Sequence, residues 1–169
     1  MINLTSKEIK GYASSSIARN ENKDCFVRAL AAGFEIGYND AHAIAKDRFN
    51  REDKKGTKGH EIISGMKEIE ESGIAIGDVI AKVKVLKGLD IKNRYKLYGE
   101  LIDRKKTVKS FIKDHPKGNY IVTVSKHAFV VKDGKLIDNV GEEFRPTRKV
   151  DGAYEILLPK DSTQLTLFN

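Results

Sequence analysis

The sequence contains a single cysteine, Cys25, among its 169 residues. One cysteine excludes an internal disulfide and any zinc site built from several cysteines. No apolar run approaches the roughly 20 residues of a membrane-spanning helix, and residues 1–5 lack the basic and apolar regions of a signal peptide. We therefore expect a cytoplasmic domain with a free thiol, large enough to bury about two-thirds of its unfolded surface.

Motifs for metals and phosphates are also missing. His42 and His60 have no partners at a useful metal-ligand spacing, and the glycines and lysine of residues 56–59 stand in the wrong order for a P-loop. We expect no metal and no cofactor.

The net charge of +7 is concentrated in one stretch of the chain. Residues 92–117 contain nine lysines and arginines against three acidic residues. Such a patch can hold nucleic acid or an acidic protein, but a solvated lysine-rich face is the simpler interpretation. Because no nucleic-acid-binding motif accompanies it, nucleic acid is a partner that we do not favour.

The hydrophobic pattern is helical in the first half and changes to strands in the second. We expect a helix from Cys25, capped by Asp24 and ended by Gly33. A second helix would be capped by Asn39 or Asp40, and a third would carry Ile62–Ile69 and stop at Gly73. Residues 50–60 form a charged loop that could cover a cleft, and residues 74–100 fit a strand or a helix.

Later in the chain, Thr107 caps a short helix that runs through Lys113. Strands then follow at Tyr120–Val124, His127–Val131, Lys135–Asn139 and Ala153–Leu158. Helices followed by an antiparallel sheet predict an α+β fold, with one domain over residues 1–160 and a tail over residues 161–169.

The hairpin that begins at His127 has a register that can be predicted. Asp133-Gly134 is typical of a two-residue turn, which pairs Val131 with Leu136 and Phe129 with Asp138. His127 and Asp138 then lie on one face of the sheet. A slip of one residue would replace Asp138 by Asn139.

Cys25, His127 and Asp138 together have the chemistry of a thiol hydrolase. A helix N-terminus and a nearby imidazole favour the thiolate, which is the nucleophile. The imidazole can take the thiol proton and return it to the leaving group, while backbone amides at the helix start hold the oxyanion. Asn22 is the best side-chain amide to complete that oxyanion hole, and Asn20 is the second choice. The alternative is a cysteine that only packs and a histidine that is only structural.

The run from Asn22 to Leu30 (NKDCFVRAL), followed by Gly37-Tyr38 and Ala41-His42, resembles the opening of a group of small phage and prophage proteins. That group has a papain-like cysteine peptidase fold and an N-D-C-x-V-R-A element. The second half is similar too, from Thr107 through the HPKG run at 115–118 to the strands at His127 and Asp138.

The resemblance covers about residues 20–140 and implies Cys25, His127 and Asp138 as the catalytic set. It also implies a phage-encoded protein in the bacterial host cytoplasm. One departure concerns the position before the histidine, where glycine is expected and Ser125-Lys126 stand. Lys126 would crowd or charge the cleft.

The C-terminal residues suggest a protein partner. Gln164, Leu165, Leu167 and Phe168 resemble the pentapeptide that binds the bacterial DNA polymerase sliding clamp. A tail of this kind inserts apolar anchors into a preformed groove. The alternative is a final β-strand, since Leu165 and Leu167 alternate with polar residues.

Two functional hypotheses follow. The first is a cysteine hydrolase, either a protease or an amidase/deamidase, that acts on a host or phage protein with a Cys25-His127-Asp138 triad. The second is a papain-like scaffold without catalysis that binds the sliding clamp through its tail.

Overall fold

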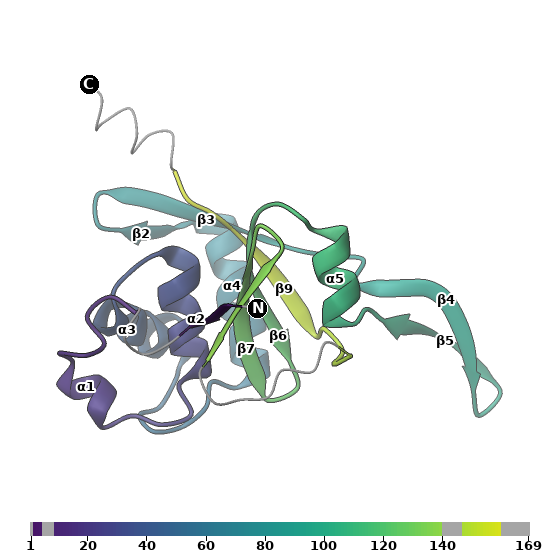
Figure 1. Ribbon diagram of the computed structural model, residues 1–169, viewed down its shortest axis with the longest axis horizontal. Coiled ribbons are helices and arrows are strands. Elements are labelled where there is room, and N and C mark those ends of the chain that lie inside the picture. The colour runs from purple at the N-terminus through teal and green to yellow at the C-terminus, as the bar shows by residue number, and fades with distance from the viewer. Residues whose placement is uncertain (1, 5–8, 140–146, 160–169) are drawn as a thin grey trace.

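A computed structural model describes residues 2–4, 9–139 and 147–159, with the backbone alone for residues 2–4, 90–97, 100–104, 138 and 139. Its centre is a seven-stranded sheet in the order β1-β8-β7-β6-β9-β3-β2 (Figure 1). All neighbours in this sheet are antiparallel except β1 and β8. The strands are β1 (Ile2–Leu4), β2 (Ile74–Ile76), β3 (Val79–Val85), β6 (Asn119–Val124), β7 (His127–Lys132), β8 (Lys135–Asn139) and β9 (Gly152–Leu157). The predicted α+β class is confirmed.

Helices cover both faces of the sheet, but unequally. The larger group packs on one face and comprises α1 (Ser16–Arg19), α2 (Cys25–Phe34), α3 (Tyr38–Phe49) and α4 (Gly59–Ser72). A smaller cluster on the opposite face is built around α5 (Val108–Asp114), with Phe111 against Tyr120 and Val122. The alternation of side chains along β6 divides its residues between the two cores, so that Ile121 faces α2 while Tyr120 and Val122 face α5.

Helix α2 is the element that positions the site, and it lies close against the sheet. A Cβ on Gly33 would stand 2.8 Å from Ile121 Cγ1, which means that only glycine lets the helix approach β6 this closely. The Asn119 side chain also donates a 2.7 Å hydrogen bond to the Gly33 carbonyl. The C-terminal half of α2 is therefore fixed on the strand that leads into the β6–β7 hairpin.

Two predicted helix boundaries were wrong for local reasons. Gly33 lies inside α2, and Glu35 takes the left-handed conformation at the C-terminal cap, with φ of 57°. Helix α3 begins at Tyr38 with Gly37 as its N-cap, so neither Asn39 nor Asp40 caps it. The caps at Thr107 and Gly73 are confirmed.

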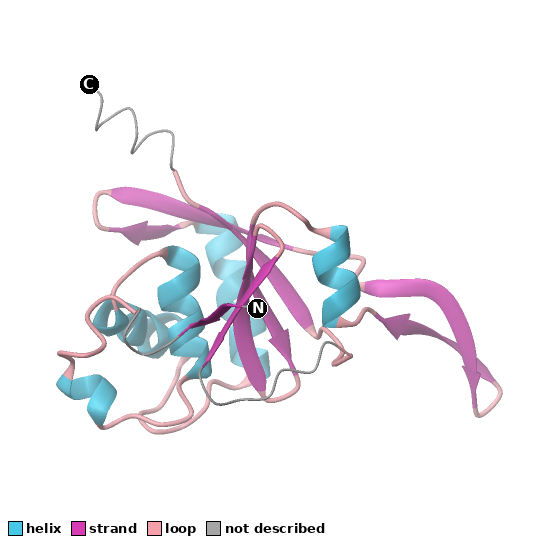
Figure 2. Cartoon of the chain, in the orientation of Figure 1, coloured by secondary structure: helices cyan, strands magenta, loops and turns pink. Residues whose placement is uncertain are grey.

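Residues 74–105 form strands rather than a helix. After β2 and β3, the strands β4 (Asp90–Leu97) and β5 (Glu100–Lys105) pair only with each other, as a hairpin that extends away from the rest of the chain (Figure 2). Much of the basic patch of residues 92–117 lies on this hairpin. Within the described residues, no helix combines the length and the apolar character needed to cross a membrane.

Candidate functional site

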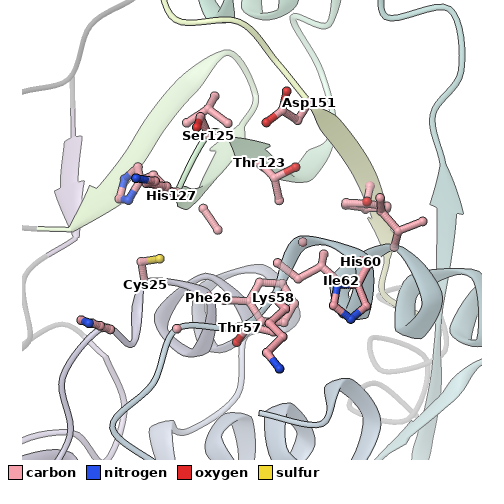
Figure 3. Close-up of a pocket in the computed structure, with 18 of the residues that line it drawn as sticks. Cys25, Phe26, Thr57, Lys58, His60, Ile62, Thr123, Ser125, His127 and Asp151 are labelled. Atoms are coloured by element: carbon pink, nitrogen blue, oxygen red, sulfur yellow. The ribbon is translucent and has the colours of Figure 1, made fainter. Parts of the chain in front are cut away.

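Cys25 and His127 line one cleft. Its volume is about 1140 Å³, and its walls come from the start of α2, residues 56–63 and the β6–β7 turn. Figure 3 shows Cys25 and His127 at the same end of this cleft, with Thr57 and Lys58 on another wall. The fold thus places two residues about a hundred positions apart in the sequence on the lining of one cleft.

Cys25 is the first residue of α2 and is half-buried. Asp24 stands at the N-cap position, but its carboxylate forms no hydrogen bond with the amides of the first turn. The carboxylate points inward instead, where it accepts hydrogen bonds from the Tyr38 hydroxyl at 2.7 Å and from Arg28 Nε at 3.2 Å. The backbone amides at the start of α2 are therefore not capped by Asp24, and the cysteine stands on the positive end of the helix dipole.

His127 is the first residue of β7 and follows a two-residue turn made by Ser125 and Lys126. It is 6% exposed, and its ring stacks on Phe129 with a centroid distance of 5.9 Å. Its backbone pairs with Val124 across the hairpin. A buried, stacked imidazole is held in one orientation, which a general base requires.

The backbone pairing of β7 with β8 favours Asp138, rather than Asn139, as the residue on the same face of the sheet as His127. Val131 pairs with Leu136 and Lys132 with Lys135, which leaves Asp133 and Gly134 as a two-residue turn with φ of 48° and 76°. This is the register that the sequence predicted. The side chain of Asp138 lies outside the described part of the structure, as do the tail residues Gln164, Leu165, Leu167 and Phe168.

The structure does not bring the predicted side-chain amide to the cleft. Asn22 is exposed, and its backbone carbonyl accepts a hydrogen bond from Arg51 at 3.2 Å. Asn20 lines a separate hollow beside α3 and bonds the Ser16 carbonyl. Among the described residues that line the cleft, neither asparagine appears.

Thr57 is a cleft residue that the sequence did not indicate. Its hydroxyl oxygen is buried and has no hydrogen-bond partner among the described residues. A threonine between glycine and lysine in a charged loop gives no signal of this kind, because the position of the loop depends on contacts made elsewhere.

Those contacts form a buried ion-pair network around Glu21, in the segment just before α2. Arg51 donates to Glu21 at 2.5 Å, His42 Nε2 lies 3.0 Å from the same carboxylate, and the Lys54 amide donates to it at 3.1 Å. Burial by itself raises the pKa of Glu21, but the hydrogen bonds from Arg51, His42 and Lys54 outweigh it and hold that pKa at about 2. The network fastens the loop of residues 50–58 to the segment just before α2.

The same cluster has the composition of a metal site. Glu21, His42 and Asp53 offer ligand atoms that all lie within 4.8 Å of one another. The guanidinium of Arg51, however, bonds Glu21 and lies 3.4 Å from His42 Nε2, where it would repel a cation. We therefore interpret the cluster as an ion-pair network.

Comparisons with protein-family models, curated proteins and solved structures find no match for this chain. The interpretation of the cleft accordingly rests on its own residues and geometry.

Proposed function

We propose that the chain is a cysteine hydrolase of papain-like fold, with Cys25 as nucleophile, His127 as general base and Asp138 as the residue that orients the histidine. The observation that carries this proposal is the placement of Cys25 and His127 in one cleft, with the cysteine at the start of a helix. A protein or peptide amide is the proposed substrate.

The reaction follows from this placement. His127 takes the proton from the Cys25 thiol, and the sulfur attacks the acyl carbon of the substrate. The carbonyl oxygen becomes an oxyanion, held by the uncapped backbone amides at the start of α2. The imidazolium then gives its proton to the leaving nitrogen, and a thioester on Cys25 remains. Water, deprotonated by His127, hydrolyses the thioester and restores the thiol.

The test is the rate of Cys25 alkylation by iodoacetamide as a function of pH, read by intact mass. The single cysteine makes the signal unambiguous. An ordinary thiol reacts slowly at pH 6, because it is almost wholly protonated well below its pKa of about 8.5. We expect the wild-type rate to stay high at pH 6, and His127→Ala to lower it at pH 6 by about tenfold while the rate at pH 9 changes little.

His60→Ala is the matched control. His60 lines the same cleft, but its side chain is 74% exposed. Its removal should leave the alkylation profile unchanged. A profile that does not respond to His127 would show that the cysteine is a packing residue, and it would overturn the proposal.

The tail carries a second proposal, favoured by the Gln164, Leu165, Leu167 and Phe168 pattern alone. In this case the chain binds the bacterial sliding clamp, with or without catalysis. Phe168→Ala should then abolish co-purification with the clamp, while Cys25→Ala should leave it intact. Retention of the clamp by the Phe168 variant would contradict clamp binding through the tail.

A further inference from the structure

Two lysines flank the catalytic pair, and both have an unusual backbone. Lys23 stands two residues before Cys25 with φ of 51°, and Lys126 stands directly before His127 with φ of 61°. Both residues line the cleft and are exposed. A positive φ is costly for any residue with a Cβ, and glycine adopts it most readily. The chain nevertheless has a long cationic side chain at both positions.

The charges in the cleft are not balanced. Its lining includes five lysines and arginines but only two carboxylates. Both carboxylates are already paired, Asp24 with Arg28 at 3.2 Å and Asp151 with Lys105 at 2.9 Å. The other three cations of the lining, Lys23, Lys58 and Lys126, form no ion pair within the described part of the chain, and they give the cleft a net positive potential. Lys23 and Lys126 are the two that stand within two residues of Cys25 and His127 in the sequence.

The remaining surface of the cleft fits a peptide better than a nucleic acid. Ile63 is 47% exposed on its wall and offers contact for an apolar side chain. The lining phenylalanine and tyrosine rings, Phe26 and Tyr154, are 2% and 3% exposed, which leaves the imidazole of His60 as an exposed ring on the lining. One such ring does not form the row of aromatic side chains on which proteins stack successive bases of a single strand. Attack by a thiolate also needs an acyl carbon, which a peptide supplies.

We propose that the cleft binds acidic peptide segments, with Lys23 and Lys126 contacting substrate carboxylates on either side of the bond that Cys25 attacks. This inference rests on the proposed hydrolase function and adds its substrate class. It also gives a role to the lysine that stands where the resemblance leads one to expect glycine.

The test measures protection of Cys25 from iodoacetamide by three ligands of equal length: a glutamate-rich peptide, its glutamine-substituted counterpart and a single-stranded oligonucleotide. We expect the acidic peptide to protect at a concentration about tenfold lower than the neutral one, and the difference to shrink at high salt. Equal protection by the two peptides, or tighter protection by the oligonucleotide, would overturn the inference.

Glycine substitutions can remove the charges of the two lysines without destabilising the fold. Lys23→Gly and Lys126→Gly remove the charges and relieve the positive φ, so the melting temperature should stay the same or rise, while the preference for the acidic peptide is lost. Lys54→Gly is the matched control, since Lys54 has φ of 63° but does not line this cleft. It should keep the full preference, and loss of the preference in this variant would contradict the assignment.

The hydrolase proposal and the acidic-peptide proposal can be contradicted independently of each other. His127→Ala should keep the preference for the acidic over the neutral peptide, because that preference depends on the charge of the lysines and not on the imidazole. Protection by the acidic peptide together with an alkylation rate indifferent to His127 would leave an acidic-peptide cleft without catalysis. An alkylation rate that depends on His127, together with equal protection by the acidic and neutral peptides, would leave a hydrolase that does not select for acidic substrates.

Discussion

The Tyr38 hydroxyl donates a 2.7 Å hydrogen bond to the Asp24 carboxylate and so ties the residue before Cys25 to the start of α3. Both side chains are buried. Burial and the nearby carboxylate together raise the pKa of Tyr38 far above its usual value of 10, so the hydroxyl remains a donor at any physiological pH. The bond fixes the first turn of α2, where Cys25 stands.

Tyr38→Phe should therefore reduce both stability and thiol reactivity. It removes a hydrogen bond to a buried charge, which costs about 1.5–3 kcal/mol of unfolding free energy. Tyr120→Phe is the control, because the Tyr120 hydroxyl donates to the neutral Lys117 carbonyl and its loss should cost only about 1 kcal/mol. Urea unfolding measures both variants. Equal losses of unfolding free energy in the two variants would show that the charge of Asp24 does not strengthen the hydrogen bond from Tyr38.

Glu21 should make the protein sensitive to acid. Its pKa is about 2 in the folded chain, against an ordinary value of 4.5. A lowered pKa means that the stabilisation is fully present above pH 4.5 and is lost as the pH falls towards 2. The loss is on the order of 3 kcal/mol. Urea unfolding of the wild type at pH 6 and pH 3 should show about 2 kcal/mol of this loss, because the pKa of the folded state lies below pH 3.

In Glu21→Gln that part of the acid dependence should disappear, and stability near neutral pH should fall by about 3 kcal/mol because Arg51 stays buried without its partner. Glu52→Gln is the control. Glu52 pairs with Lys55 on the exposed surface, where ion pairs contribute little, so this variant should follow the wild-type pH profile. An acid transition that persists unchanged in Glu21→Gln would contradict the role of the network.

Gly33 and Gly65 should differ in how well they tolerate alanine. A Cβ at Gly65 would lie 2.7 Å from the Arg48 carbonyl oxygen and 2.4 Å from Phe49, so that backbone must move. At Gly33 its close contacts, at 2.8 and 2.9 Å, are with the Ile121 side chain. Alanine gains about 1 kcal/mol of helix propensity at either position, against about 1–3 kcal/mol for overpacking. We expect Gly65→Ala to be clearly destabilising, and Gly33→Ala to cost less, because the contact at Gly33 is with a side chain and not with backbone. Thermal unfolding of both variants checks this order.

The parts of the fold that the sequence predicted are those specified by neighbouring residues. The Asp133-Gly134 turn determines its own register, and Thr107 caps α5 through a hydrogen bond to the Ser110 amide three residues away. The prediction that Gly33 ends α2 was wrong, because a glycine that permits close packing and a glycine that ends a helix look the same in sequence. Only the approach of Ile121 distinguishes them.

The residues of the candidate site also differ in whether local sequence patterns reveal them. Cys25 and His127 follow from a helix start and a strand start, which local patterns reveal. Thr57 does not, because it lies in a loop that is held by tertiary contacts such as the pairing of Glu21 with Arg51, 30 residues apart. Charged residues in a polar loop resemble solvated ones in sequence, since the burial that makes them structural comes from the tertiary fold.

The backbone register leads us to expect that Asp138, rather than Asn139, orients His127. Asp138→Ala should lower the alkylation rate of Cys25 at pH 6 by at least about tenfold, because the imidazole loses the group that holds its orientation. Asn139→Ala should leave the rate unchanged. The opposite result, with sensitivity at Asn139 alone, would show that the hairpin is displaced by one residue beyond Ile137.

Thr57 offers a test of substrate contact that is independent of stability. Its buried hydroxyl has no hydrogen-bond partner among the described residues, so Thr57→Val removes no bond in the unliganded protein. Because an unsatisfied buried hydroxyl costs about 1–3 kcal/mol, valine of nearly the same shape should keep or raise the unfolding free energy. If the hydroxyl bonds the substrate, the same variant should weaken protection of Cys25 by the acidic peptide about fivefold to tenfold. Thr57→Ser, which retains the hydroxyl, should restore most of that protection. A valine variant that loses stability instead would show that the hydroxyl bonds a part of the protein itself.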